Sequence, residues 1–210
     1  MTDKAYVAGV GMVPFQKPGK SESYDVMATA ATRSALADAG LDYDKVQQAY
    51  VGYVYGDSTC GQRALYHVGM TGIPVLNVNN NCSTGSSALF LARQAVESGA
   101  VECALALGFE QMQPGAIGAM FHDRVSPFAA FDRETDELVG SAEIPLALRY
   151  FGGAGKAHMD EFGTPLETFA KIRAKASRHA AKNPVALFRQ EVTAEDVMAA
   201  QVVWPGIMTK

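Results

Sequence analysis

The sequence has few cysteines, and they stand at unrelated spacings. They are Cys60, Cys82 and Cys103, and none of the four histidines lies at a metal-ligand spacing from them. Disulfide frameworks need an even set of cysteines, and structural zinc sites need short Cys/His clusters. The pattern therefore argues against both kinds of site. It predicts a protein of a reducing compartment, the cytoplasm.

Long apolar runs and a large excess of one charge are also missing. No run approaches the ~20 residues of a bilayer span, and the opening MTDKAYVAGVG lacks the basic-then-apolar pattern of a signal peptide. The net charge of −4 gives no general attraction to nucleic acid or anionic membranes. Gly9 and Gly11 form only part of a dinucleotide-binding motif, because no third glycine follows at the required spacing. We predict no nucleic-acid or membrane partner, no bound cofactor and no metal.

The 210 residues, 48% of them hydrophobic, can form one large or two small cores. Strand and helix patterns alternate over residues 2–112, which predicts an α/β layered domain with a parallel or mixed sheet. The expected strands are residues 5–12, 47–55, 74–78 and 101–108, and the expected helices are residues 23–39, 61–69 and 83–98.

The alternation of strand and helix patterns ends at Gln113, and loops and helices are expected after it. Helices are predicted over residues 144–151 and 154–162. Thr164 and Glu167 form a capping-box pattern that predicts a helix to about Lys182, and a further helix starts at Thr193.

The most informative stretch is residues 74–97, PVLNVNNNCSTGSSALFLARQAVE. A short β-type run ends in three asparagines, which tolerate left-handed backbone angles, and an apolar helix follows. Cys82 therefore lies at the mouth of that helix, where unpaired N–H groups and the helix dipole favour a thiolate. The alternative is a small buried thiol without a chemical role, which we assign to Cys103.

These residues carry a resemblance. The segment NNCSTGS at residues 80–86 resembles the nucleophile motif of the thiolases. Together with GYVYGDSTCGQRA at residues 52–64 and FGGAGKAHMDEFGT at residues 151–164, it resembles the sterol carrier protein-type branch of that family. The resemblance extends over residues 6–201.

The resemblance implies a thiolase fold, in which two similar halves stack as alternating αβαβα layers with mixed sheets. Residues 1–112 would form the N-terminal α/β domain and residues 113–201 an inserted, mostly helical loop domain. Residues 202–210 would start the return to the N-terminal domain. A homodimer is also implied, because the strand at residues 75–80 pairs with its twin in the family.

The resemblance further implies the chemistry of an acyl-CoA thiolase in fatty-acid or sterol side-chain degradation. Cys82 would attack the keto carbonyl of a 3-ketoacyl-CoA, and CoA, a co-substrate, would then take the acyl group. Phe151 would lie beside the pantetheine. Lys171, Lys175 and Arg178 lie within about 60° of one another on a helix and would guide the phosphates of acyl-CoA; the alternative is a solvated helix face.

Two family motifs of the second half are missing. No histidine is followed by proline, so the Gly-His-Pro motif that activates the nucleophile is absent, and neither Cys60 nor Cys103 stands in a Cys-x-Gly motif. The expectation is a chain incomplete by itself, which needs a C-terminal half or a complementary subunit. The four histidines present are treated as structural or solvent-exposed: His67, His122, His158 and His179.

Two other functions stay open. One is a thiolase-like retro-aldolase, in which the cysteine is dispensable, although the full Asn-Asn-Cys-Ser-Thr-Gly motif argues against it. The other is an inactive acyl-CoA-binding or assembly subunit. The presence of Gly-His-Pro and Cys-x-Gly motifs in downstream sequence would discriminate among the three.

Overall fold

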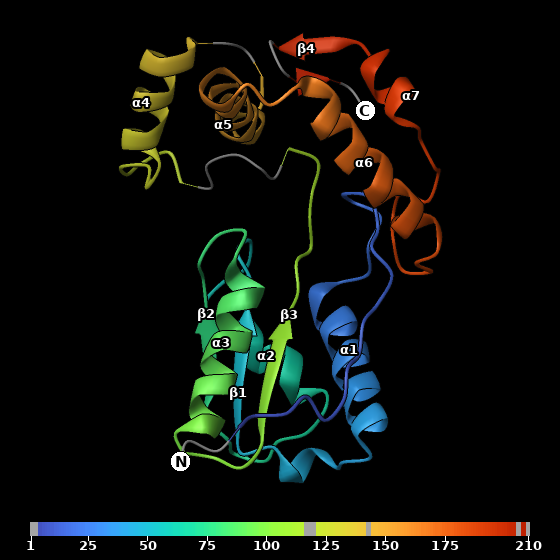
Figure 1. The fold of residues 1–210 in the computed structure, drawn as a ribbon. Helices are drawn as coiled ribbons and strands as arrows, with labels where there is room; N and C mark the ends of the chain where they lie inside the picture. The colour runs from blue at the N-terminus through green and yellow to red at the C-terminus, as the bar shows by residue number, and fades with distance from the viewer. Residues whose placement is uncertain (1–3, 116–120, 142–143, 205–206, 209–210) are drawn as a thin grey trace. The chain divides into compact units, whose positions relative to one another are not determined.

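The computed structural model describes residues 4–115, 121–141, 144–204 and 207–208. The chain divides into two compact units, Met1–Ala116 and Ile117–Lys210. The first unit contains, in chain order, α1 (Tyr24–Ala39), the 3₁₀ turn η1 (Tyr43–Lys45), β1 (Gln48–Gly52), α2 (Cys60–Tyr66), β2 (Val75–Val78), α3 (Thr84–Glu97) and β3 (Ala104–Gly108) (Figure 1). The assignment of the two units to a thiolase half and a loop domain stays a prediction.

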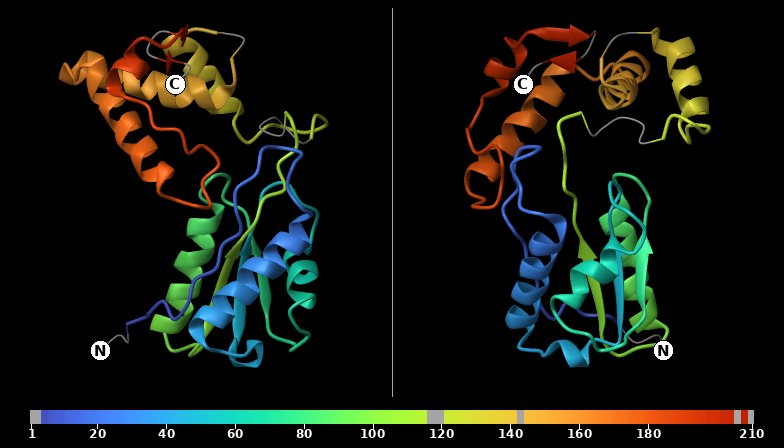
Figure 2. Two further views of the ribbon diagram at one scale, coloured as in Figure 1. Left: turned by 90° about the vertical axis from the view of Figure 1, so that its right-hand side faces the viewer. Right: turned by 180° about the vertical axis from the view of Figure 1, so that it is seen from behind.

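The first unit has a three-stranded parallel sheet in the order β2-β1-β3. Ala49 of β1 lies opposite Val75 on one side and Leu105 on the other. Helices α1 and α2 cover one face and α3 covers the other (Figure 2). The predicted α/β class is confirmed. The described strands of this sheet are all parallel, so the alternative of a mixed sheet is not seen among them.

The two faces of β1 fill two separate cores. Ala49 and Val51, both fully buried, point to α1 and α2, whereas Tyr50 points to α3. The face of α3 that meets the sheet is made of small side chains, which let the helix axis approach closely: Ala88, Ala92 and Ala95. On the other side of α3, Leu89 is 56% and Phe90 61% exposed. Burying this side would remove further apolar surface from water.

The strand expected at residues 5–12 does not form, and that prediction was wrong. The segment runs along α1 instead: a Cβ at Gly11 would lie 2.2 Å from the carbonyl oxygen of Ala31, so only glycine permits this approach. The backbone N–H of Val10 donates to Asp38 Oδ2 at 2.8 Å. The Val10 N–H, which in a strand would donate to the neighbouring strand, is thus bonded to the Asp38 side chain.

The second unit contains α4 (Ala129–Val139), α5 (Leu146–Phe162), α6 (Leu166–Ala181) and α7 (Ala194–Met198), and a short antiparallel pair of β4 (Val202–Trp204) with β5 (Ile207–Met208). No helix among the described residues is long and apolar enough to cross a membrane. The expected return of residues 202–210 to the first unit stays a prediction, and Pro205, Gly206, Thr209 and Lys210 lie outside the described residues.

Two helix boundaries of this unit differ from expectation. The helices expected over residues 144–151 and 154–162 form one continuous α5, in which Gly155 faces the ring of Phe169 on α6. The expected capping box at Thr164 does not form, because α6 begins one residue later with Pro165 as its N-cap. The helix start at Thr193 is confirmed, with a complete capping box to Asp196.

Polar contacts join α4 to α5. Arg149 is almost fully buried, pairs with Asp136 and donates to the carbonyl of Gly140 at 2.8 Å. The hydroxyl of Tyr150 donates to the carboxylate of Asp132. Burial and this hydrogen bond raise the pKa of Tyr150 to about 12. Two acidic residues of α4 are thereby held by two consecutive residues of α5.

We expect Tyr150 to make the chain sensitive to alkali. Its folded-state pKa of about 12 exceeds the ordinary value of 10.0, so its contribution is complete below pH 10 and is lost as the pH rises toward 12. The free energy of unfolding, measured with urea at a series of pH values, should fall more steeply in this window for the wild type than for Tyr150→Phe. Substitution of the exposed Tyr6 by phenylalanine is the control. Parallel curves for wild type and Tyr150→Phe would contradict the prediction.

Candidate nucleophile site

Cys82 lies in the elbow between β2 and α3, at the carboxyl edge of the sheet. Asn81 has a left-handed φ of 48°, as the asparagine run predicts, and Ser83 is the N-cap of α3. The thiol is exposed. The predicted position at the helix mouth is therefore confirmed, whereas its role as nucleophile stays a prediction.

The backbone on both sides of Cys82 is fixed by Thr84. This buried residue accepts a hydrogen bond from the Asn80 N–H at 2.9 Å and donates its hydroxyl to the Asn81 carbonyl at 2.5 Å. The Asn80 side chain in turn donates to Ser87 Oγ at 2.9 Å. These contacts orient the elbow before any ligand is present, which is what a nucleophile at a helix start requires.

The start of α3 can pack against the end of β1 only because the last residue of β1, Gly52, has no side chain. A Cβ at Gly52 would lie 2.6 Å from Cγ2 of Thr84 and 3.0 Å from its carbonyl oxygen. A Cβ at Gly85, the next residue of α3, would meet no such neighbour within 4 Å. The position of the elbow thus depends on the missing side chain of Gly52.

The other two cysteines are less accessible. Cys60 is buried, and its hydrogen bond with Tyr24 raises the pKa of that phenol to about 12. Cys103 is half-buried, and burial raises the pKa of its thiol. Only Cys82 combines an open thiol with the start of a long helix.

We expect iodoacetamide to alkylate Cys82 first in the folded chain. The reagent reaches an exposed thiol directly, whereas buried Cys60 needs local opening and the raised pKa of half-buried Cys103 leaves less of its thiolate. Peptide mass spectrometry after short exposures measures the three rates. In urea the three thiols should react at similar rates, which controls for intrinsic reactivity. Equal or faster labelling of Cys60 or Cys103 under native conditions would overturn the expectation.

The histidines do not provide a base for Cys82 within its own unit. His67 directly follows α2, which leads away from the carboxyl edge, and its Nε2 lies 3.2 Å from Asp25 Oδ2. In the second unit, His158 packs on the rings of Phe162 and Phe169. No cluster of His, Cys, Asp and Glu that could hold a metal ion occurs in the part of the chain that is described.

The four residues expected to bind substrate all lie in the second unit. Phe151 on α5 is 76% exposed. On α6, Lys171 is paired with Glu167 at 2.9 Å, and together with Arg178 it lines a hollow of about 320 Å³. Glu191 and Glu195 line the same hollow, so it is not a simple anion site, and Lys175 lies outside it. Their role toward an acyl-CoA stays a prediction.

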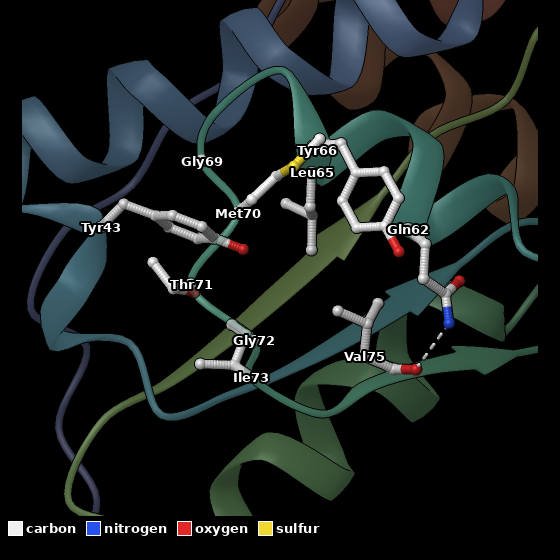
Figure 3. Close-up of a pocket in the computed structure, with 10 residues that line it drawn as sticks. All are labelled: Tyr43, Gln62, Leu65, Tyr66, Gly69, Met70, Thr71, Gly72, Ile73 and Val75. Carbon is white, nitrogen blue, oxygen red and sulfur yellow. Dashed lines mark hydrogen bonds between the residues drawn. The ribbon is translucent and has the colours of Figure 1, made fainter.

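A larger hollow lies on the first unit, away from Cys82. It has a volume of about 480 Å³ and lies beside the end of α2 and the loop that leads to the start of β2 (Figure 3). The side-chain amide of Gln62 is already bound to the carbonyl of Val75 at 3.1 Å. The lining contains no charged residue: Tyr43, Gln62, Leu65, Tyr66, Gly69, Met70, Thr71, Gly72, Ile73 and Val75. It contains no cysteine, histidine or carboxylate, and its hydroxyl groups are those of Tyr43, Tyr66 and Thr71.

Sequence reasoning missed Glu110. Its carboxylate accepts hydrogen bonds from the N–H groups of Val54 and Tyr55, in the loop that follows β1. A carboxylate just after a buried strand, at the edge where Cys82 also lies, was the available signal. The fold makes that signal meaningful by placing β3 next to β1.

Comparison with known proteins decides the family. The family model of the thiolase N-terminal domain matches residues 5–202. The chain belongs to the thiolase family. The resemblance seen in residues 52–64 and 80–86 is thereby confirmed.

Among curated thiolase relatives, sterol carrier protein 2 of Homo sapiens is 50% identical over 207 residues, which cover 96% of this chain and 37% of that protein. The benzoylsuccinyl-CoA thiolase subunit BbsB of Thauera aromatica is 32% identical over 204 residues, which cover 95% of this chain and 49% of the subunit. The chain thus spans half or less of the length of these relatives. The likeness to sterol carrier protein 2 confirms the predicted branch.

A solved structure supports the fold. The Ltp2-ChsH2(DUF35) aldolase matches with a TM-score of 0.75 and 20% identity, over 98% of this chain and 51% of that chain. At this identity the likeness concerns the fold alone. It confirms the thiolase-type architecture.

Proposed function

We propose that the chain supplies the nucleophile of an acyl-CoA thiolase. Cys82 attacks the keto carbonyl of a 3-ketoacyl-CoA, the bond between the α carbon and the keto carbon breaks, and the acyl group stays on sulfur as a thioester. The released acyl-CoA carbanion takes up a proton. CoA thiol then takes the acyl group and regenerates Cys82.

The observation that carries the proposal is the exposed Cys82 thiol at the start of α3, in an elbow whose backbone is bonded to Thr84 at Asn80 and Asn81. The N–H groups at the helix start favour negative charge, so the Cys82 N–H can stabilise the oxyanion of the tetrahedral intermediates. Membership of the thiolase family supports this class of chemistry. The reaction also needs an acid and base, which we assign to a C-terminal half or a complementary subunit.

For the substrate, we assign the pantetheine arm to Phe151 and the phosphates to the cations of α6. Lys175 is exposed and lies outside the hollow that Arg178 and Lys171 share with Glu191 and Glu195, so it is better placed for an anion than Lys171, which Glu167 partly neutralises. The acyl group would come from fatty-acid or sterol side-chain degradation, and the reaction would take place in the cytoplasm. No bound cofactor is needed, since CoA is a co-substrate.

The test is the mass of the acyl-enzyme. The chain, joined to a thiolase C-terminal half, is mixed with 3-ketoacyl-CoA without CoA, and intact-protein mass spectrometry should detect an acyl adduct on Cys82. The Cys82→Ala variant should not form it, and the Cys103→Ala variant should. Cleavage that persists in Cys82→Ala without an adduct would indicate a retro-aldolase. Binding without cleavage would indicate a non-catalytic subunit.

We also propose a homodimer, formed through β2. This strand lies at the edge of the sheet and pairs with β1 alone among the described strands, and Leu76 is partly exposed there. An open edge of this kind favours pairing with a second copy. Sedimentation of the chain with its C-terminal half should give a dimer at micromolar concentration. A monodisperse monomer would contradict this.

A further inference from the structure

Three loops meet at the edge of the sheet where Cys82 lies. Because β1, β2 and β3 are parallel, the residues that follow Gly52, Val78 and Gly108 leave the sheet at the same edge. The loop after β1 carries Tyr55, the loop after β2 carries Cys82, and the loop after β3 carries Glu110. The chemistry of this edge therefore includes more than the cysteine.

Glu110 binds the loop after β1 through both carboxylate oxygens. Oε2 accepts the Val54 N–H at 2.9 Å and Oε1 accepts the Tyr55 N–H at 3.0 Å. Hydrogen bonds to a charged acceptor are stronger than those to a neutral one, and two on consecutive residues fix the direction of the backbone. The backbone of Tyr55 is thus set by a residue far away in the sequence.

Tyr55 and Cys82 leave neighbouring strands. The N–H of Tyr53 donates to the carbonyl of Val78 at 3.3 Å, so the pairing of β1 with β2 continues up to the start of both loops. Tyr55 is half-buried. Burial raises the pKa of Tyr55, and the negative charges of Glu110 and of ionised Cys82 raise it further. Because β1 and β2 are paired up to Tyr53 and Val78, the loop that carries Tyr55 and the loop that carries Cys82 start side by side at the same edge of the sheet.

We propose that Glu110 is a positioning residue, which holds the Tyr55 phenol next to Cys82 as a neutral hydrogen-bond donor. A phenol with a pKa at or above the ordinary value of 10.0 stays protonated throughout the physiological range. On the proposed thiolase function, its O–H faces the sulfur or the carbonyl oxygen of the acyl group attached to it. The carboxylate of Glu110 acts only through the backbone of the loop and does not touch the substrate.

The test is a titration of Tyr55 in the full chain by NMR of tyrosines labelled with ¹³C at Cζ, with the resonance assigned from Tyr55→Phe. A cysteine is already ionised where a tyrosine titrates, so Cys82→Ala removes a negative charge and should lower the pKa of Tyr55. Glu110→Asp keeps the charge but is too short to hold both N–H groups. In that background Cys82→Ala should lower the pKa of Tyr55 clearly less than in the wild type.

The matched control is Glu102→Gln, because Glu102 precedes β3 whereas Glu110 follows it. This change should leave the effect of Cys82→Ala intact. An unchanged pKa of Tyr55 in Cys82→Ala would show that the two side chains are apart, and equal effects in wild type and Glu110→Asp would show that Glu110 does not position Tyr55. Either result overturns the proposal. The titration uses no substrate, so it tests the position of Tyr55 independently of the thiolase reaction. If Cys82 formed no acyl adduct, the proposed thiolase function would be wrong, but the titration result would still hold.

Discussion

Replacement of Cys82 by alanine is expected to lower the rate of 3-ketoacyl-CoA thiolysis at least about 10⁴-fold, since loss of a nucleophile removes the whole covalent pathway. The measurement is the initial rate with the chain joined to a thiolase C-terminal half. The fold should be retained, because the Cys82 side chain is exposed and the elbow is held by Thr84 and Asn80 instead. A normal thermal unfolding temperature for the variant would confirm that the loss is chemical.

Cys103→Ala is the matched control for this prediction. Cys103 lies just before β3, at the opposite edge of the sheet, and its substitution should leave the rate within a small factor of the wild type. A Cys82→Ala variant that retained a substantial fraction of thiolysis would remove the nucleophile from the mechanism. A retro-aldol activity insensitive to the substitution would assign the site to carbon–carbon cleavage without an acyl-enzyme.

Substitution of Gly52 by alanine is expected to destabilise the first unit by about 1–3 kcal/mol, the usual cost of an added methyl group in a packed interior. The new Cβ would overlap Thr84, including its carbonyl oxygen, which is backbone and cannot rotate away. Relief requires a shift of the start of α3, and therefore of Cys82. Urea unfolding measures the stability, and the rate of Cys82 alkylation reports the shift.

Gly85→Ala provides the contrast one residue beyond Thr84. Its Cβ would meet nothing within 4 Å, and the residue lies inside α3. Alanine in a helix is favoured over glycine by up to about 1 kcal/mol, so this variant should be neutral or more stable. If Gly52→Ala were as stable as Gly85→Ala, the close approach of β1 and α3 would not limit the site.

The elements around Cys82 could be predicted because their signals are local. The left-handed residue at Asn81, the start of α3 and the strands that became β1 and β2 all follow from short patterns of asparagine, β-branched and apolar residues. The motif at residues 80–86 added the chemistry. These signals need no knowledge of which strands become neighbours.

The errors and omissions arise where distant residues decide. The segment at residues 5–12 has a strand pattern, but the contact between Gly11 and Ala31 on α1 and the bond from Val10 to Asp38 override it. Glu110 and Tyr55 come together only through the order of the strands, which no local pattern contains. The placement of Phe151 and the α6 cations toward Cys82 depends on two separate units.

The strand order also determines how this edge comes together during folding. Ala49 pairs with Val75, whereas Gln48 pairs with Ala104, which is more than twice as far along the chain. Closing a loop of twice the length costs about 0.6 kcal/mol more in chain entropy, and such distant contacts slow folding. We therefore expect β1, α2 and β2 to assemble first and β3 to dock last. Cys82 would then reach the start of α3 before the Glu110 carboxylate binds the loop after β1. A partly folded species that accumulates during refolding should therefore contain the elbow around Cys82 and lack the hydrogen bond from the Tyr55 N–H to Glu110.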